Sequence, residues 1–145
     1  MQRHLWPALQ RRFADQLQPS MSPDRLLRGL CVVPLEGQEE SAVWTLGFRE
    51  VGTCARTPSL SRDFTALASM VDPDVPCYLL VYVGDAPRQN AAAAYEPGVK
   101  DWALISYVPA SSSSYAAKKM ADNRAGLKAG LGADNFVQTG MWCVD

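Results

Sequence analysis

The side chains that carry most enzyme chemistry are scarce in this sequence. Its only histidine is His4, so the chain lacks an internal histidine for a Ser-His-Asp triad, a Cys-His pair or a histidine-based metal cage. Its four cysteines form no Cys-x-x-Cys pair, which argues against a zinc site. We therefore expect no enzyme activity, no catalytic residues, no metal site and no cofactor. The cysteines are predicted to be reduced thiols in the core: Cys31, Cys54, Cys77 and Cys143.

Basic side chains gather in one C-terminal segment, which is predicted to be a helix from about Ser114 to Leu131. Met120, Leu127 and Leu131 recur at helical spacing and would form one narrow buried stripe. Gly132 is placed to cap the C-terminal end. The outward face of this helix is predicted to carry Lys118, Asp122 and Ala129.

The charged face of this helix allows two interpretations. It can be an ordinary solvated surface, which is the more common role of such charges. It can also be a contact surface, because Lys and Arg beside small residues permit close approach to an acidic partner and speed its encounter. Periodicity alone does not separate the two.

Composition sets the limits within which this helix must act. The chain has 145 residues, 48% of them hydrophobic, and a net charge of −1, which is typical of one globular domain. Its charge gives no support for a nucleic-acid partner. No apolar run of about 18 residues occurs, and the N-terminus does not read as a signal peptide. We expect a cytoplasmic protein.

Helices and hairpins alternate along the predicted chain. Apolar residues at helical spacing predict helices over 5–17 and 60–71 besides the one over 114–131, with Ser59 or Ser61 as the cap of the second. Residues 53–59 are expected to be irregular, and residues 84–98 a projecting loop. Apolar and β-branched runs predict strands, the first two joined by a polar turn over 36–40. These strands cover residues 30–35, 42–48, 77–83, 102–108 and 136–144.

This order predicts an α/β (α+β) fold with a mixed sheet and helices on both faces. Three segments of the chain, over 76–80, 101–109 and 120–132, also resemble the actin-depolymerising factor homology (ADF/cofilin) domain, and most closely the N-terminal such domain of the twinfilins. The resemblance implies a central mixed sheet of five to six strands sandwiched between helices. It implies one such domain over 1–145 that lacks the family's C-terminal helix.

The resemblance also implies a function. Domains of this family bind actin by placing the long helix in the cleft between two actin subdomains, and they are not enzymes. The twinfilin-like members sequester actin monomers, preferring ADP-actin, and regulate assembly at filament ends. Further partners expected for the full-length protein are phosphoinositide lipids and capping protein. The domain itself is expected to be monomeric and to act on the cytoskeleton without nucleic acid. The alternative is a regulatory interaction module of the same fold that does not bind actin.

Site residues follow from aligning the family's long helix without gaps over 102–132. Two basic positions of the family then fall on Tyr115 and Ala117, the neighbouring Met on Lys118, and the next basic position on Arg124. A second register would match Lys119 and Met120 to the family's Lys-Met pair, but it needs a gap inside the helix. The predicted actin contacts are Tyr115, Lys118, Lys119, Asp122, Asn123, Arg124 and Lys128.

Overall fold

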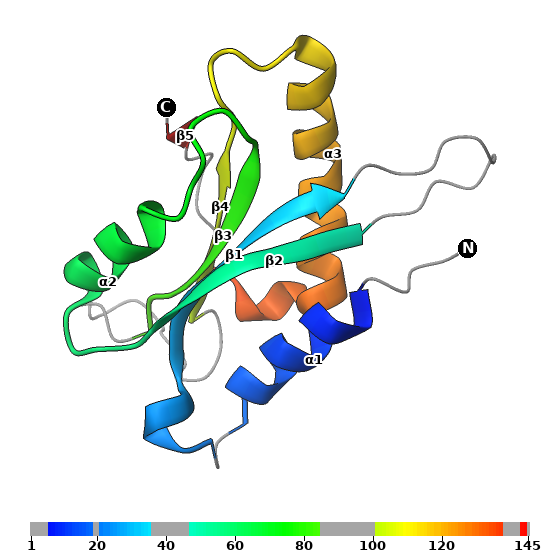
Figure 1. The fold of residues 1–145 in the computed structure, drawn as a ribbon. Coiled ribbons are helices and arrows are strands. Elements are labelled where there is room, and N and C mark those ends of the chain that lie inside the picture. The colour runs from blue at the N-terminus through cyan, green and yellow to red at the C-terminus, as the bar shows by residue number, and fades with distance from the viewer. Residues whose placement is uncertain (1–5, 19–20, 36–46, 85–100, 138–142, 145) are drawn as a thin grey trace, which may run out of the picture.

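The computed structural model describes residues 6–18, 21–35, 47–84, 101–137 and 143–144. They form a five-stranded mixed sheet in the order β2-β1-β3-β4-β5, in which β5 runs parallel to β4 and the other neighbours are antiparallel. Helices α1 and α3 cover one face of this sheet and α2 covers the other (Figure 1). In chain order the elements are α1 (Trp6–Gln16), β1 (Leu27–Leu35), β2 (Gly47–Ala55), α2 (Leu60–Ala68), β3 (Cys77–Tyr82), β4 (Trp102–Tyr107), α3 (Ser114–Leu131) and β5 (Cys143–Val144).

The centre of the sheet is β3, whose first five residues are buried. A strand with helices over both faces has no solvent-facing side, which is why its sequence is apolar without alternation. The pairing of β1 with β3 ends at Val32–Tyr78, whereas its pairing with β2 continues to Leu35–Gly47. Pro34 lies in this outer part, where its missing N–H breaks no ladder to β3.

Aromatic side chains dominate the core under α1 and α3. Phe13 of α1 lies edge-on to Trp102, with ring centroids 5.0 Å apart, and stacks on Phe136 at 5.5 Å. Tyr82 meets the other side of Trp102 at 5.5 Å. Such rings bury much apolar surface and fix one another's orientation. They hold α1 and the segment after α3 against the same strands.

A buried ion pair lies on the α2 side of the sheet. The Arg28 Nε donates to Asp63 Oδ2 at 2.9 Å, and both side chains are almost fully buried. The same guanidinium donates to the carbonyl oxygens of Tyr82 and Thr57, while Asp63 accepts from the Thr57 N–H and hydroxyl. These bonds satisfy charges that would otherwise be costly to bury. The network ties β1, the start of α2 and the end of β3 together.

The architecture confirms the predicted mixed sheet with helices on both faces, and the predicted limits of the third helix match α3. The second helix begins after Ser59, whose hydroxyl accepts from the Arg62 N–H, so Ser59 rather than Ser61 is its cap. Two thiols, those of Cys31 and Cys77, are buried as predicted, and Cys54 is partly buried. The side chain of Cys143 lies outside the described part of the chain.

Several predicted strand limits were wrong. The described part of the second strand covers Gly47–Ala55, so this strand continues past the predicted end at residue 48 and through part of the segment predicted to be irregular. Pairing with the long β1 overrides the low strand propensity of Gly52. The first strand starts at Leu27 rather than at residue 30. In the last predicted strand, Phe136 makes only a single bridge to Trp102, and the described strand is Cys143–Val144.

Four predicted segments fall partly or wholly on residues that the structure does not describe. The polar turn over 36–40, residues 42–46 of the second predicted strand and most of the loop over 84–98 lie outside the described residues. The same holds for residues 138–142 of the last predicted strand. In the described part of the chain, no helix is long and apolar enough to cross a membrane.

Candidate functional site

Helix α3 is fixed at both ends and along its inner side. The Ser113 hydroxyl accepts from the Ala116 N–H at 3.1 Å, which caps the N-terminal end. Gly132 ends the helix with φ of +100°, a conformation that disfavours other residues. The buried Tyr78 hydroxyl donates to the Met120 carbonyl. Burial raises the pKa of Tyr78, so this hydroxyl stays protonated and able to donate.

The inner stripe of α3 is the predicted one. Met120, Leu127 and Leu131 are buried in the core against the sheet. The burial of Met120 agrees with the gapless alignment of the helix, which leaves this residue in the core. Because the inner stripe is narrow, most of the circumference of α3 is left for other contacts.

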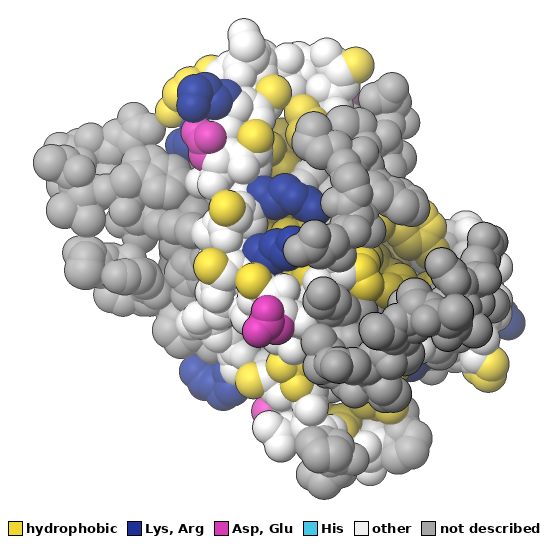
Figure 2. Space-filling view, turned by 180° about the vertical axis from the view of Figure 1, so that it is seen from behind, with side chains coloured by type: hydrophobic (Ala, Val, Ile, Leu, Met, Phe, Trp, Pro, Cys, Tyr) yellow, Lys and Arg dark blue, Asp and Glu magenta, His cyan; other side chains and the backbone are white. Residues whose placement is uncertain are grey.

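The outward face of α3 carries little net charge. Lys118 and Asp122 both point to solvent, as predicted, and form an ion pair with 3.1 Å between Nζ and Oδ2. Small exposed residues, Ala121, Ala125 and Ala129, share the outer side with this pair. Figure 2 shows Lys and Arg side chains along this helix, separated by small or hydrophobic side chains and by acidic ones. A partner can therefore approach the helix backbone closely here.

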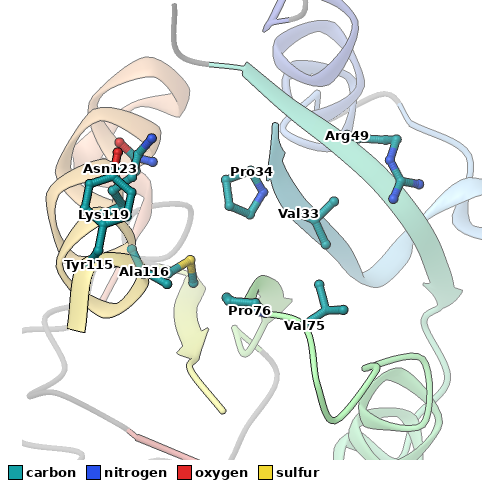
Figure 3. A pocket seen from close by; sticks show the side chains of 10 residues that line it. Val33, Pro34, Arg49, Val75, Pro76, Tyr115, Ala116, Lys119 and Asn123 are labelled. Carbon is teal, nitrogen blue, oxygen red and sulfur yellow. The ribbon is translucent and has the colours of Figure 1, made fainter. Parts of the chain in front are cut away.

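A groove runs along one flank of α3, between the helix and the sheet (Figure 3). Tyr115, Lys119 and Asn123 follow one another at four-residue spacing and lie on the side of α3 that lines it. The cavity volume is about 340 Å³. Its other lining residues are Val33, Pro34, Arg49, Val75, Pro76, Ala116 and Met120.

The groove is lined by apolar side chains together with two positively charged ones. Tyr115 is 62% exposed, an unusual position for a large aromatic side chain, and the Lys119 Nζ lies 5.4 Å from its ring centroid. The charged residues among the described lining are Lys119 and Arg49, which are both basic. Tyrosine and arginine are enriched at protein interfaces, and two basic side chains on opposite walls of the groove would favour an acidic partner.

The opposite flank of α3 is tied to the sheet. The Arg124 Nη1 donates to the Ser106 hydroxyl of β4 at 2.8 Å, and the side chain is half-buried. Burial lowers the pKa of Arg124. Lys128 is half-buried in the last turn, where a positive charge stabilises the C-terminal end of the helix dipole. Both residues therefore have structural roles besides any contact with a partner.

The seven predicted contact residues thus divide among three surfaces. Lys118 and Asp122 are on the outward face, whereas Arg124 and Lys128 are half-buried away from it. Asn123, predicted as a main contact, is only 8% exposed and is reached from the groove alone. The structure thus brings Tyr115, Lys119 and Asn123 together in one groove and does not unite all seven in a single patch.

Sequence reasoning missed the far wall of the groove. Val33, Pro34 and Arg49 come from β1 and β2, and Val75 and Pro76 from the segment before β3. The positions of these residues depend on the register of β1 against β2 and β3.

No arrangement typical of catalysis or of a divalent metal site occurs in the described residues. They contain no group of three or more His, Cys, Asp or Glu side chains able to hold a metal ion. Asp63, the buried aspartate among them, is engaged by Arg28 and Thr57. No protein-family model matches the sequence, and no curated protein matches it either.

Proposed function

We propose that this chain is an actin-binding domain of the ADF homology class, similar to the N-terminal domain of the twinfilins. In this proposal it sequesters actin monomers, preferentially ADP-actin, and regulates filament assembly on the cytoskeleton. It acts by binding alone, without catalysis or a cofactor. Phosphoinositide lipids and capping protein are proposed as further partners of the full-length protein.

The observation that carries the proposal is the exposure of α3. An 18-residue helix is fixed by its inner side, while Lys118, Asp122 and three alanines remain open to a partner. The order of helices and strands and the mixed sheet between helices also agree with what the resemblance implies. A rigid helix that is already ordered binds without the cost of folding on the partner.

The proposed mechanism is steric. The outward face of α3 enters the cleft between two actin subdomains, where Ala121 and Ala125 allow close packing. Tyr115 and Lys119 contact the acidic rim of that cleft from the groove side. A monomer held in this way cannot add to a filament in the usual manner. Nucleotide exchange on the bound monomer slows, because the cleft is restrained from opening.

One observation favours a second candidate, an interaction module of the same fold that does not bind actin. The gapless alignment puts uncharged residues, Tyr115 and Ala117, at two positions where the family is basic. The charge of Lys118 is in turn balanced by Asp122. In this alternative the apolar groove beside α3, rather than its outward face, holds the partner.

A titration of fluorescently labelled actin monomers tests the proposal. The unaltered chain is expected to bind, and to bind ADP-loaded more tightly than ATP-loaded monomers. Replacing both lysines, Lys118→Glu with Lys119→Glu, is expected to weaken binding at least about tenfold, because two favourable charges become repulsive. Arg62→Glu is the matched control, since Arg62 is an exposed cation on α2 across the sheet.

A second variant distinguishes an effect of charge position on binding from an effect of helix stability. Lys118→Glu combined with Asp122→Lys keeps an ion pair on the same turn but reverses its direction, so the helix is preserved. Weaker binding by this variant supports contact through the outward face. Equal affinity of all variants would contradict the placement of the site. If the unaltered chain binds neither monomers nor pelleted filaments, actin binding is wrong and the second candidate replaces it.

A further inference from the structure

Two cysteines lie together on the α2 side of the sheet, in a cavity of about 180 Å³. Cys31 of β1 faces Leu79 of β3 in the strand register, and Cys77 precedes Leu79 by two residues. Residues two apart on a strand share a face, so both thiols project to the same side. Cys31 is 1% and Cys77 2% exposed, yet both line the cavity.

The two thiols are in direct contact. Cys77 donates a hydrogen bond to the Cys31 sulfur, which lowers the pKa of Cys31 against the opposing effect of burial. The same bond, together with burial, raises the pKa of Cys77. Sulfur atoms at hydrogen-bonding distance are close enough to ligate one metal ion.

A third sulfur lies beside this pair. Gly52 of β2 is the direct strand partner of Cys31, so a side chain at Gly52 would project on the same face. A Cβ placed there would lie 2.8 Å from the Met70 Sδ, which shows that the thioether fills the space that glycine leaves open. Met70 lines the same cavity as Cys31 and Cys77. Sulfur-containing side chains from β1, β3 and the turn after α2 therefore line one cavity.

We propose that Cys31, Cys77 and Met70 form a binding site for the soft monovalent cation Cu(I). Thiolate and thioether ligands select Cu(I) over harder ions. Asp72 also lines the cavity, but the described residues contain no group of three or more His, Cys, Asp or Glu side chains able to hold a metal ion, so the four ligands that Zn²⁺ prefers are incomplete. Cu(I), in contrast, is stable with two or three sulfur ligands.

Binding is a proton-for-metal exchange without oxidation or reduction. One Cu(I) binds two thiolates, both thiol protons pass to solvent, and the thioether adds no charge, so the site carries one negative charge. Two charged residues of opposite sign, Arg49 and Asp72, also line the cavity, and Arg49 is the one that opposes the charge of the site. Because protons compete with the metal, affinity should rise with pH.

Competition between the reduced full chain and a chromophoric Cu(I) chelator, without oxygen, tests the proposal. We expect one equivalent of Cu(I) per chain. Cys31→Ser or Cys77→Ser should lower the affinity at least about 100-fold, and Met70→Leu by a smaller factor, because a thioether is the weaker ligand. Cys54→Ser is the matched control: this thiol is on β2, is partly buried, and is not among the described cavity residues.

Two further measurements show whether the variants are folded and which atoms bind the metal. Far-ultraviolet circular dichroism shows whether each variant is folded, and X-ray absorption of the unaltered chain with one equivalent of Cu(I) shows the ligand atoms directly. A shell of sulfur atoms alone supports the site. A shell containing nitrogen or oxygen, no binding in competition, or an equal loss of affinity in Cys54→Ser would overturn it. None of these outcomes depends on actin binding.

Discussion

The two faces of the sheet are stabilised by different interactions. Under α1 and α3, aromatic rings pack on one another, with Phe13, Trp102 and Phe136 within 5.5 Å between centroids. Under α2, the core is made of aliphatic and sulfur-containing side chains, next to the buried pair of Arg28 and Asp63. Apolar packing dominates the first face, with hydrogen bonds of Tyr78 and Arg124 at α3, whereas a buried ion pair is built into the second.

This difference separates two tasks of the molecule. Aromatic packing does not depend on charges on the far side of a helix. Substitutions that change the charge of the outward face of α3 should therefore leave this packing intact. The α2 face depends on groups that titrate and on sulfur atoms that bind soft metals. We therefore expect changes on the α2 face to alter stability, and changes on the outward face of α3 to alter binding.

The largest effect is expected from Asp63→Ala. Removing this carboxylate leaves Arg28 buried without its counter-charge, which should lower the free energy of unfolding by about 3–5 kcal/mol. Urea denaturation measures the change. Asp15→Ala, at an exposed aspartate of α1, is the control, with an expected change within about 0.5 kcal/mol. Similar losses of stability in Asp63→Ala and Asp15→Ala would contradict the expected difference between the two faces of the sheet.

A smaller, pH-dependent effect should come from the same pair. Burial raises the pKa of Asp63, but hydrogen bonds from Thr57 and Arg28 and the positive charge of Arg28 outweigh it, so the pKa is lowered overall. A lowered pKa stabilises the folded state above the unfolded value of about 3.9, and this stabilisation is lost as pH falls through the folded pKa.

Denaturation between neutral pH and about pH 2 measures this dependence. We expect the unaltered chain to lose stability relative to Asp63→Asn as pH falls, because asparagine does not titrate. Parallel curves for the two proteins over this range would show that Asp63 contributes nothing to acid unfolding.

The smallest effect is expected at the exposed pair of α3. A double-mutant cycle with Lys118→Ala and Asp122→Ala should give a coupling energy of about 0.3–0.5 kcal/mol, and added salt should reduce it. Thermal and urea denaturation of the four proteins provide the values. A coupling above about 2 kcal/mol would mean that this face is also built for stability, which would contradict the division between the two faces.

Much of the fold was predictable because local signals and tertiary packing agree. The spacing of Met120, Leu127 and Leu131 predicted α3 at its observed limits, and the apolar run of β3 predicted a strand. Where they disagree, prediction failed. Gly52 does not favour a strand, yet pairing with β1 extends β2 through it.

The candidate site was predictable in part. The exposed positions of Lys118 and Asp122 follow from helical periodicity alone, since they lie opposite the buried stripe. The burial of Asn123 follows from the same periodicity, because it lies three residues after Met120 and four before Leu127, whereas the bond of Arg124 to Ser106 depends on how α3 packs on β4. The groove itself needs residues from β1, β2 and the segment before β3.

What the sequence alone determined is therefore the set of elements and the inner and outer faces of α3, because both follow from periodicities of the chain. Only the tertiary structure decided which distant residues meet. The register of β1 against β2 and β3 places Cys31 beside Cys77 and leaves Met70 its space over Gly52. Strand register is set by the packing of whole faces, and no local pattern in the chain records it.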